Sequence, residues 1–508
     1  MGMQRTMRFV RTVQRSMRRT IGLGISLIRC VLVTIIVLIV GAFSGSVVMA
    51  QPVIPGLPVI PPFTLPDLTY LQPLQVPTIP EVLDQLVPPK EFPPVVDPVP
   101  PVAALSPEDQ SAGLSDIQAF RAALMPSDVG DALFDHYPAG LADMTNGQII
   151  DVRDITATAA GLVGAPVRQV TQFKFRTNDA SDIASFGTAS LVMPAAPWTG
   201  GGSRPIVVNN LPIDALGRAC TAGYTLAHGP SITTTNVTDF IPPVTAASLA
   251  APNGGYAVLL TDHEGPRMAY AEPKVAGQTI LDSIRAMRSL FADELGDSRM
   301  VMTGYSGGAI ATNGAAKLID SYAPDLKPLI VGAALGGTPI DFAVLTQSMN
   351  GVVNAAKGVE LGAGIGVARE HPEILSAVNN AGAQVAEITR DLCITGVGLF
   401  GLLPIDLAMV ANIIDPFRSD LANKIYAETK MAGVKYGTPL FVYNGNEEFW
   451  IPKIMAQQLY EEQCALGTPS VLRLPFGEHV IAAVTGLPEA LLWMHDRLRG
   501  VPAPSECY

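Results

Sequence analysis

The chain has 508 residues, of which 48% are hydrophobic and only 15% are charged, and its formal net charge is -12 at pH 7. This length allows about three domains or one large α/β enzyme domain, and the hydrophobic fraction is ample for a large core. The acidic balance argues against a nucleic-acid-binding protein, because no basic face is available to neutralise phosphates.

The first 50 residues are arranged like an export signal. Residues 1–19 hold many arginines and no acid, and residues 21–48 are almost wholly apolar. A basic start, an apolar run and a short cleavage region before Gln51 are the parts of a signal peptide. We expect cleavage after Ala50 and an extracellular or cell-envelope location. The alternative is a membrane anchor, because the apolar run is long enough to span a bilayer.

Residues 51–105 are rich in proline, which recurs every few residues. Proline removes backbone donors and favours the extended polyproline conformation. We interpret this segment as a semi-rigid linker; a ligand for a proline-recognising module is the alternative. The catalytic domain is then expected over residues 106–508.

Within that domain, strand-like runs alternate with segments of helical length. The predicted strands are residues 169–176, 188–193, 205–209, 257–261, 300–303, 329–334, 439–443 and 470–474. The clearest predicted helices are residues 275–294 and 453–464. This alternation predicts an α/β fold with a mainly parallel sheet and helices on both faces.

The alternation lapses between Thr338 and Lys430, where the sequence is Gly/Ala-rich and apolar. So long a departure inside an α/β core is typical of an inserted helical cap, which we place at about residues 340–430. Ordinary core helices are the alternative.

The sequence GYSGG at residues 304–308 lies between a strand-like run and a small-residue stretch that can form a helix. In this context G-x-S-x-G is the nucleophile elbow of α/β-hydrolases. Gly304 and Gly308 would let strand and helix cross closely, and Ser306 would point into a cleft. The backbone N–H of Gly307 would then stabilise an oxyanion. A glycine-rich turn without a catalytic role is the alternative.

The base is expected after the serine, since the fold places serine, acid and histidine in that chain order. Three histidines follow Ser306, at positions 371, 479 and 495. His371 lies in the predicted cap and His495 in the middle of a predicted helix. His479 lies in a turn between the last strand and the last helix, where a general base can be positioned.

The acid is expected to be a glutamate, because no aspartate occurs between Leu421 and His495. The loop after strand 439–443 contains Glu447 and Glu448, and either could orient an imidazole as an aspartate does. Two loop acids without a role are the alternative.

Several motifs together resemble the secretory lipase family. They are YPAG at 137–140, DHEG at 262–265, GYSGGAIAT at 304–312, YAPDL at 322–326, GGTP at 336–339, YEEQC at 460–464, GEH at 477–479 and GLP at 486–488. The resemblance covers roughly residues 126–507. It implies an α/β-hydrolase that cleaves carboxylic esters of lipids.

The resemblance also implies site residues. The family's acid precedes a short apolar stretch that ends in proline, and Glu448 before Pro452 fits that spacing, with glutamate in place of the usual aspartate. The family's oxyanion hole pairs the N–H after the nucleophile with an aspartate six residues before a cysteine. Asp214 before Cys220 matches that pattern, and Asp262 is expected to be structural.

Five cysteines occur, and Cys30 lies in the predicted signal. The four that remain, in an exported chain, indicate disulfides, although spacing does not determine the pairing. The family resemblance implies Cys220–Cys393 and Cys464–Cys507.

The sequence thus predicts a secreted serine hydrolase, such as a triacylglycerol lipase or esterase, with a Ser306–Glu448–His479 triad. We expect no metal or cofactor, and a lipid ester and a lipid interface as partners. The alternatives are an acyltransferase or esterase acting on cell-envelope lipids, and a non-catalytic envelope-binding protein on a hydrolase scaffold.

Overall fold

The computed structural model describes residues 79–92, 114–231, 235–350, 354–403 and 406–507. The predicted signal or anchor, residues 1–50, and most of the proline-rich segment lie outside these ranges. None of the helices within them is long and apolar enough to cross a membrane.

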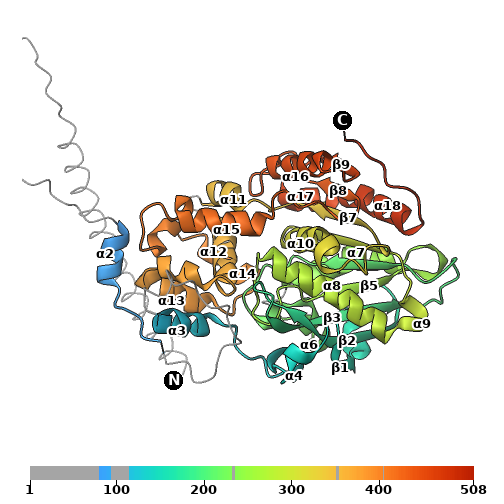
Figure 1. Ribbon diagram of the computed structural model, residues 1–508, viewed down its shortest axis with the longest axis horizontal. Coiled ribbons are helices and arrows are strands. Elements are labelled where there is room, and N and C mark those ends of the chain that lie inside the picture. The colour runs from blue at the N-terminus through green and yellow to red at the C-terminus, as the bar shows by residue number, and fades with distance from the viewer. Residues whose placement is uncertain (1–78, 93–113, 232–234, 351–353, 404–405, 508) are drawn as a thin grey trace, which may run out of the picture. The chain divides into compact units, whose positions relative to one another are not determined.

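The described residues form a nine-stranded sheet in the order β1-β2-β3-β5-β4-β6-β7-β8-β9 (Figure 1). The strands are β1 (Ile149–Asp154), β2 (Val167–Asn178), β3 (Ala184–Pro194), β4 (Ile206–Asn210), β5 (Ala257–Thr261), β6 (Met300–Tyr305), β7 (Ile330–Gly336), β8 (Leu440–Tyr443) and β9 (Ser470–Arg473). The pairs β1–β2, β2–β3 and β3–β5 are antiparallel. The pairs β5–β4, β4–β6, β6–β7, β7–β8 and β8–β9 are parallel. The predicted mainly parallel α/β sheet is therefore confirmed.

Strand β1 is the one strand that the sequence analysis did not predict. It reads IIDVRD, and its side chains are only partly buried or exposed. A sheet-edge strand with three charged residues in six lacks the apolar run by which the other strands are recognised.

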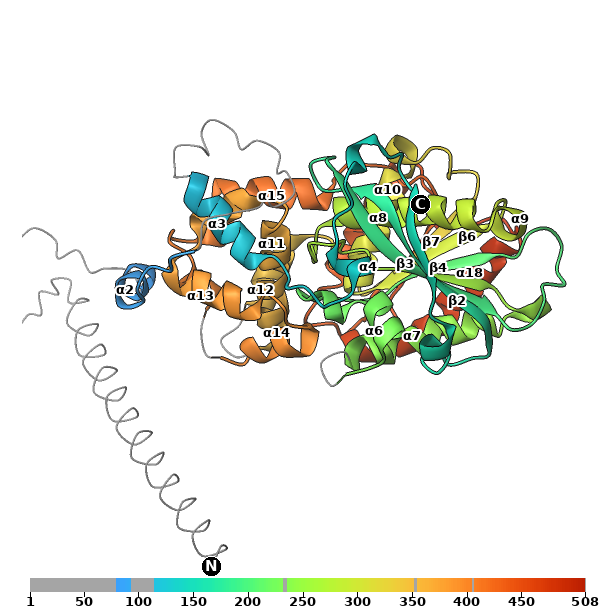
Figure 2. The ribbon, with the colours of Figure 1, turned by 90° about the horizontal axis from the view of Figure 1, so that it is seen from below.

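Helices cover both faces of the sheet, as Figure 2 shows for α8 (Pro273–Leu290) and α10 (Gly307–Tyr322) on one face and α6 (Ala222–His228) and α7 (Thr235–Leu249) on the other. The other described helices outside the segment between β7 and β8 are α2 (Ile79–Leu86), α3 (Leu114–Leu124), α4 (Ala132–Asp135), α5 (Thr156–Ala159), α9 (Ala292–Leu295), α16 (Ile454–Ala465), α17 (His479–Thr485) and α18 (Leu487–Leu498). Short 3-10 turns lie at η2 (Leu141–Asp143), η3 (Arg218–Cys220) and η4 (Pro252–Gly254).

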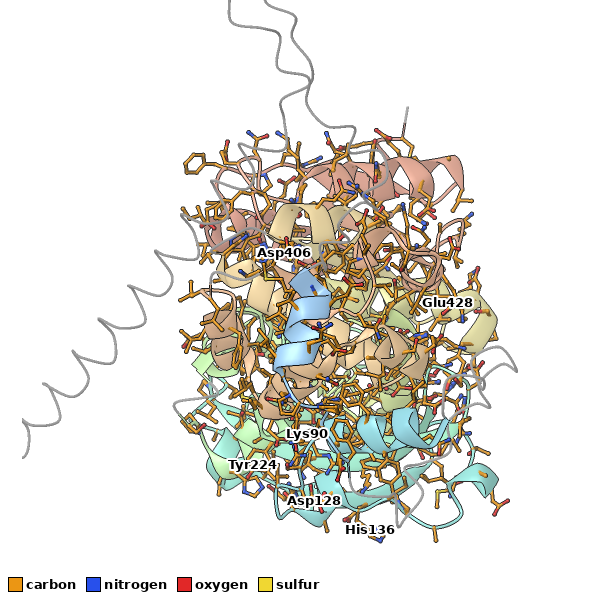
Figure 3. The ribbon with its side chains drawn as sticks, turned by 90° about the vertical axis from the view of Figure 1, so that its left-hand side faces the viewer. Lys90, Asp128, His136, Tyr224, Asp406 and Glu428 are labelled. Carbon is orange, nitrogen blue, oxygen red and sulfur yellow. A yellow bond between two sulfur atoms is a disulfide. The ribbon has the colours of Figure 1, made fainter. Side chains whose placement is uncertain are left out.

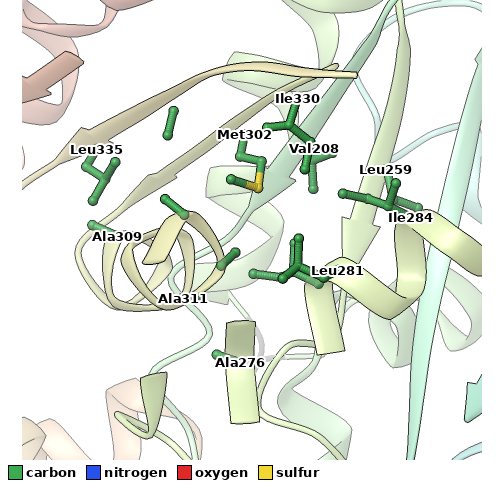
Figure 4. Close-up of a cluster of buried hydrophobic side chains, with 14 of the residues drawn as sticks. Val208, Leu259, Ala276, Leu281, Ile284, Met302, Ala309, Ala311, Ile330 and Leu335 are labelled. Atoms are coloured by element: carbon green, nitrogen blue, oxygen red, sulfur yellow. The ribbon is translucent and has the colours of Figure 1, made fainter. Parts of the chain in front are cut away.

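Successive side chains of the central strands pack on opposite faces of the sheet. Val208 packs with Leu281 of α8 in one buried cluster, shown in Figure 4, whereas Val207 packs with Trp493 of α18 in another. Burial of each such aliphatic side chain stabilises the fold by about 1.5–3 kcal/mol. A strand buried on both faces must be apolar at nearly every position, which is why these runs are conspicuous in the sequence.

The chain between β7 and β8 forms a separate group of helices at one end of the sheet (Figures 1 and 2). They are α11 (Phe342–Met349), α12 (Ala355–Ala368), α13 (Asn380–Thr389), α14 (Ile394–Phe400) and α15 (Asp420–Lys430), with the 3-10 turns η5 (Pro372–Ala377), η6 (Leu407–Val410) and η7 (Pro416–Arg418). This helical group coincides with the region where an inserted cap is predicted. Helix α3, from far earlier in the chain, shares a buried cluster with it.

Part of the predicted linker differs from the expectation. Helix α2 packs against α13, where the amide of Asn380 donates to the backbone oxygens of Asp84 and Val87, both at 3.1 Å. Lys90, labelled in Figure 3, pairs with Glu387. Because of these contacts, residues 79–92 are not a free spacer. A helix can form here since no proline occurs between Pro80 and Pro88.

Candidate active site

Ser306 lies on a sharp turn between β6 and α10. Its backbone has φ 55° and ψ -122°, a strained conformation for a residue with a side chain. A Cβ on Gly304 would lie 2.0 Å from the backbone oxygen of Gly308, and one on Gly308 would lie 2.0 Å from that of Asn210. Both glycines are thus needed for the strand and the helix to meet in this turn.

His479, the first residue of α17, faces Ser306. Its Nε2 lies 3.0 Å from Ser306 Oγ, and the hydroxyl of Tyr305 donates to its backbone oxygen at 2.5 Å. The ring of Trp450 stacks on the imidazole with centroids 6.1 Å apart. His479 is therefore held by two neighbours that the sequence analysis did not select. Tyr305 directly precedes Ser306 in the sequence, and Trp450 lies two residues after Glu448.

Glu448 lies on the other side of the imidazole, with Oε2 2.8 Å from His479 Nδ1. Its Oε1 accepts hydrogen bonds from the backbone N–H groups of Trp450 at 2.8 Å and Ile451 at 3.2 Å. Burial by itself would raise the pKa of Glu448. The pKa is nevertheless lowered, because His479 contributes a hydrogen bond and a charge and the two backbone N–H groups donate to the carboxylate. A carboxylate in this position can stabilise an imidazolium.

Glu447, the neighbouring candidate, points elsewhere. Its carboxylate is exposed and accepts from the backbone N–H of Gly477 at 2.7 Å and from the amide of Asn446 at 2.8 Å. It therefore holds two loop segments together, and the carboxylate that contacts the imidazole of His479 is that of Glu448.

Asp214 lies beside the N-terminus of α10, after β4. A Cβ built on Gly307 would lie 1.5 Å from Asp214 Oδ1, so the carboxyl fills the space next to that glycine. Oδ1 is buried and has no hydrogen-bond partner among the described residues. Burial raises the pKa of Asp214 to about 7, although the nearby N–H of Gly307 lowers it. The structure thus places both predicted oxyanion-hole residues side by side, with a carboxyl that can carry a proton near neutral pH.

Ser306, His479 and Asp214 line a cavity of about 440 Å³. Its other wall comes from the helices between β7 and β8, through apolar side chains of α11, α12, α13 and α15. These include Phe342, Leu345, Met349, Val359, Ile365 and Ile425. A largely apolar cavity with a few polar groups at one end is the usual form of a small-molecule site.

Comparison with protein families matches residues 244–506 to the secretory lipases. The chain belongs to the secretory lipase family. Lipase 5 of Candida albicans is 28% identical over 407 residues, covering 76% of this chain and 84% of that protein. The secreted triacylglycerol lipase LIP4 of Malassezia globosa is 27% identical, covering 73% and 81%.

Among solved structures, lipase A of Candida antarctica matches with a TM-score of 0.65 and 25% identity, over 74% of this chain and 87% of that one. Its closed state matches with a TM-score of 0.66, over 76% and 89%. The expected family, the α/β-hydrolase fold and the carboxylic ester hydrolase class are thereby confirmed. The alternative of a non-catalytic envelope-binding protein is set aside.

The DHEG run of this secretory lipase supports the loop that carries Asp214. His263 Nε2 lies 2.9 Å from the backbone oxygen of Leu211, and burial lowers the pKa of His263 to about 4, so the ring is neutral. Glu264 is wholly buried, and burial followed by the charge of Asp214 raises its pKa well above the usual range. Asp262 instead accepts from Thr188 Oγ1 at 2.7 Å, as expected of a structural residue.

The other two histidines after the serine have separate partners in this lipase. His371 Nε2 lies 2.8 Å from Glu272, and His495 Nδ1 lies 2.6 Å from the hydroxyl of Tyr256. Neither lines the cavity. In the described parts of the chain, no cluster of three or more histidine, cysteine or acidic side chains could hold a metal ion.

The lipase has the two disulfides that the family resemblance implied. Cys220–Cys393 joins the segment after β4 to the start of α14, across 173 residues. Cys464–Cys507 joins α16 to the C-terminal segment. The first bond therefore ties the helices between β7 and β8 to the loop that carries Asp214.

Proposed function

We propose that this protein is a secreted lipase that hydrolyses triacylglycerols and related lipid esters through Ser306, His479 and Glu448. The observation that carries the proposal is the continuous contact from Ser306 Oγ to His479 Nε2 at 3.0 Å and from His479 Nδ1 to Glu448 at 2.8 Å. This contact lies in the wall of an apolar cavity.

In the proposed mechanism, Ser306 Oγ attacks the acyl carbonyl while His479 Nε2 accepts the hydroxyl proton. His479 then donates that proton to the leaving alcohol, and an acyl-enzyme remains. Water, activated in turn by His479, releases the fatty acid. Glu448 keeps the Nδ1–H tautomer and stabilises the imidazolium in both steps.

The oxyanion of each tetrahedral intermediate is proposed to accept hydrogen bonds from the backbone N–H of Gly307 and from the carboxyl of Asp214. Two properties of Asp214 support this role: its Oδ1 has no partner among the described residues, and burial raises its pKa to about 7. A protonated carboxyl in a buried site is a strong, preorganised donor.

The substrate class is inferred from the cavity and from the relatives. The apolar lining from the cap suits an acyl chain, and one relative is a secreted triacylglycerol lipase. We infer that the inserted residues, about 340–430, act as a cap that covers this chain and keeps water from it.

A lipid surface is the proposed docking partner. Exposed apolar side chains lie on the loop that carries Glu448, on the loop before His479 and on α17; they are Phe449, Phe476, Val480, Ile481 and Val484. Phe476 is 71% exposed, and Val480 both lines the cavity and is 62% exposed. Exposed apolar side chains beside a binding cavity are typical of a membrane or lipid contact, and we call these five residues the apolar rim.

Export is proposed from the N-terminal sequence and from the disulfides. Residues 1–50 have the arrangement of a signal peptide or anchor. The disulfides Cys220–Cys393 and Cys464–Cys507 are compatible with an oxidising compartment. The segment from 51 to about 78 is the proposed linker.

The decisive experiment compares wild type with Ser306→Ala in fluorophosphonate labelling and triacylglycerol hydrolysis. We expect the variant to lose labelling and several orders of magnitude of turnover, because the nucleophile is removed from a preformed turn. Ser376→Ala, an exposed serine of the cap, is the matched control. Labelling that persists in Ser306→Ala would refute the assignment. Product analysis with an added acceptor alcohol separates hydrolysis from acyl transfer.

A further inference from the structure

Helix α12 places a single acidic side chain in the wall of the apolar cavity. Glu360 lines the same cavity as Ser306 and His479. Both carboxyl oxygens of Glu360 are buried, and neither has a hydrogen-bond partner among the described residues. The mechanism proposed above does not use this group.

No positive charge compensates Glu360 among its described neighbours. Lys357, one turn earlier on α12, donates to the backbone oxygen of Leu403 at 2.7 Å. The charge that acts on Glu360 is that of Asp406, which is labelled in Figure 3. Burial, and then the charge of Asp406, raise the pKa of Glu360 to about 8. At neutral pH the side chain is therefore mostly a carboxylic acid, with one donor and one acceptor facing the cavity.

Two other cap helices bring polar groups to the same cavity. Thr346 of α11 and Tyr426 of α15 both line it. Burial, and to a smaller extent the charge of Glu360, raise the pKa of Tyr426, while a hydrogen bond with Thr346 lowers it. Three cap helices thus surround one polar region in an otherwise apolar wall.

We propose that Glu360, with Tyr426 and Thr346, forms a subsite that binds a hydroxyl group on the acyl chain of the substrate. The proposal rests on the function proposed above and narrows its substrate class to esters of hydroxylated long-chain acids. Glu360 comes from the cap and not from the sheet that carries Ser306. The hydroxyl is therefore expected along the chain and not at the reacting carbonyl.

A hydroxyl is the chemical match because it can donate and accept at once, as a neutral carboxyl can. A plain methylene chain would leave the buried carboxyl unpaired, and an unpaired buried group is disfavoured. A site that hydrogen-bonds a substrate hydroxyl strongly rejects an analogue without that hydroxyl. An apolar pocket discriminates less strongly between substrates that differ only in size. For one hydrogen bond of this kind we expect a preference of about tenfold in kcat/KM.

The test measures kcat/KM on pairs of long-chain esters that differ only in a hydroxyl near the carbonyl, at mid-chain or at the chain end. Each rate is divided by that of the same protein on a butyrate ester, which is too short to reach deep into the cap. Wild type should prefer one hydroxylated ester about tenfold. Glu360→Gln keeps a neutral donor and acceptor and should retain most of that preference.

Glu360→Leu removes both groups and should lose the preference. Glu461→Leu, an exposed acid on α16 outside the cavity, is the control and should keep it. The proposal is overturned by a wild-type ratio near one at every hydroxyl position, by retention of the preference in Glu360→Leu, or by a stronger preference for a chain with an amino group. Failure of wild type to hydrolyse even the butyrate ester would instead refute the proposed function.

Discussion

At the scale of single residues, two adjacent glutamates have opposite surroundings. The side chain of Glu448 is 0% exposed and contacts His479, whereas Glu447 is exposed and bonds to the backbone of Gly477. Glu448→Gln keeps the shape but removes the charge that stabilises the imidazolium, so we expect turnover to fall by up to about 10⁴. Glu447→Gln is the matched control and should lose little. Turnover on a short-chain ester decides between them.

A third variant refines this prediction. Glu448→Asp restores the residue type usual in the family but shortens the side chain, so the carboxylate retracts from the imidazole. We expect partial activity, between wild type and Glu448→Gln. A loss of activity in Glu447→Gln equal to that of Glu448→Gln would mean that the assignment of the acid is wrong.

Glu360 also predicts a pH dependence of stability. Burial and the charge of Asp406 raise its pKa from 4.5 to about 8 in the folded protein, and Tyr426 is the other titratable group beside it. Because the folded state holds this proton more tightly than the unfolded chain, the free energy of unfolding falls as pH rises from about 4.5 to about 8. Glu360→Gln cannot ionise, so its Tm should exceed that of wild type at pH 8, and the difference should shrink toward pH 5.

Thermal unfolding across this pH range measures the effect, with the exposed Glu461→Gln as control. If the Tm difference between Glu360→Gln and wild type stays constant with pH, the pKa of Glu360 is not raised in the folded protein and the prediction is wrong.

At the scale of elements, α17 combines the base with part of the apolar rim. The helix begins at His479, and Glu478 caps it by accepting from the backbone N–H groups of Val480 and Ile481. The same short helix therefore positions the imidazole and presents apolar side chains to solvent. A change on its exposed face can alter docking to lipid without touching the reacting groups.

Val484 tests this separation, because it is 70% exposed and does not line the cavity. Val484→Ser should lower the rate on emulsified triacylglycerol severalfold while the rate on a dissolved short-chain ester changes little. Leu492→Ser is the matched control, since Leu492 is 68% exposed on α18 and lies outside the cavity. Equal effects of the two variants on the emulsion would argue against a specific lipid-docking rim.

At the scale of the whole molecule, α2 makes the folded part longer than the predicted domain. It contacts α13 through the hydrogen bonds of Asn380 to Asp84 and Val87. Beyond its end, the ring of Phe92 stacks on Phe120 of α3 with centroids 4.8 Å apart. A protein that begins at residue 106 loses all of them. One that begins at residue 76 keeps them.

We expect both shortened proteins to fold and to hydrolyse esters, because Ser306, His479 and Glu448 lie far downstream of either start. The shorter one should melt several degrees lower, since each lost hydrogen bond contributes about 1 kcal/mol and each such amount shifts Tm by about 2–4 °C in a large domain. Parallel thermal melts measure this. Identical Tm values would mean that the α2 contacts add no stability.

The amino-acid sequence alone was sufficient to predict what local patterns encode. The buried strands, the glycines around Ser306 and the family motifs are recognisable because strand burial and a tight turn impose residue types over a few positions. The edge strand β1 and helix α2 were missed, because partial burial leaves only a weak pattern in the sequence.

Only the tertiary structure decided which distant groups meet. The family resemblance implied that Glu448 meets His479 and that Asp214 meets Gly307, but their distances depend on loops that are far apart in the chain. The carboxyl of Glu360, which has no hydrogen-bond partner among the described residues, was visible only in the folded structure. The charge state of a carboxyl depends on burial and on neighbouring charges, and neither can be read from its own position in the sequence.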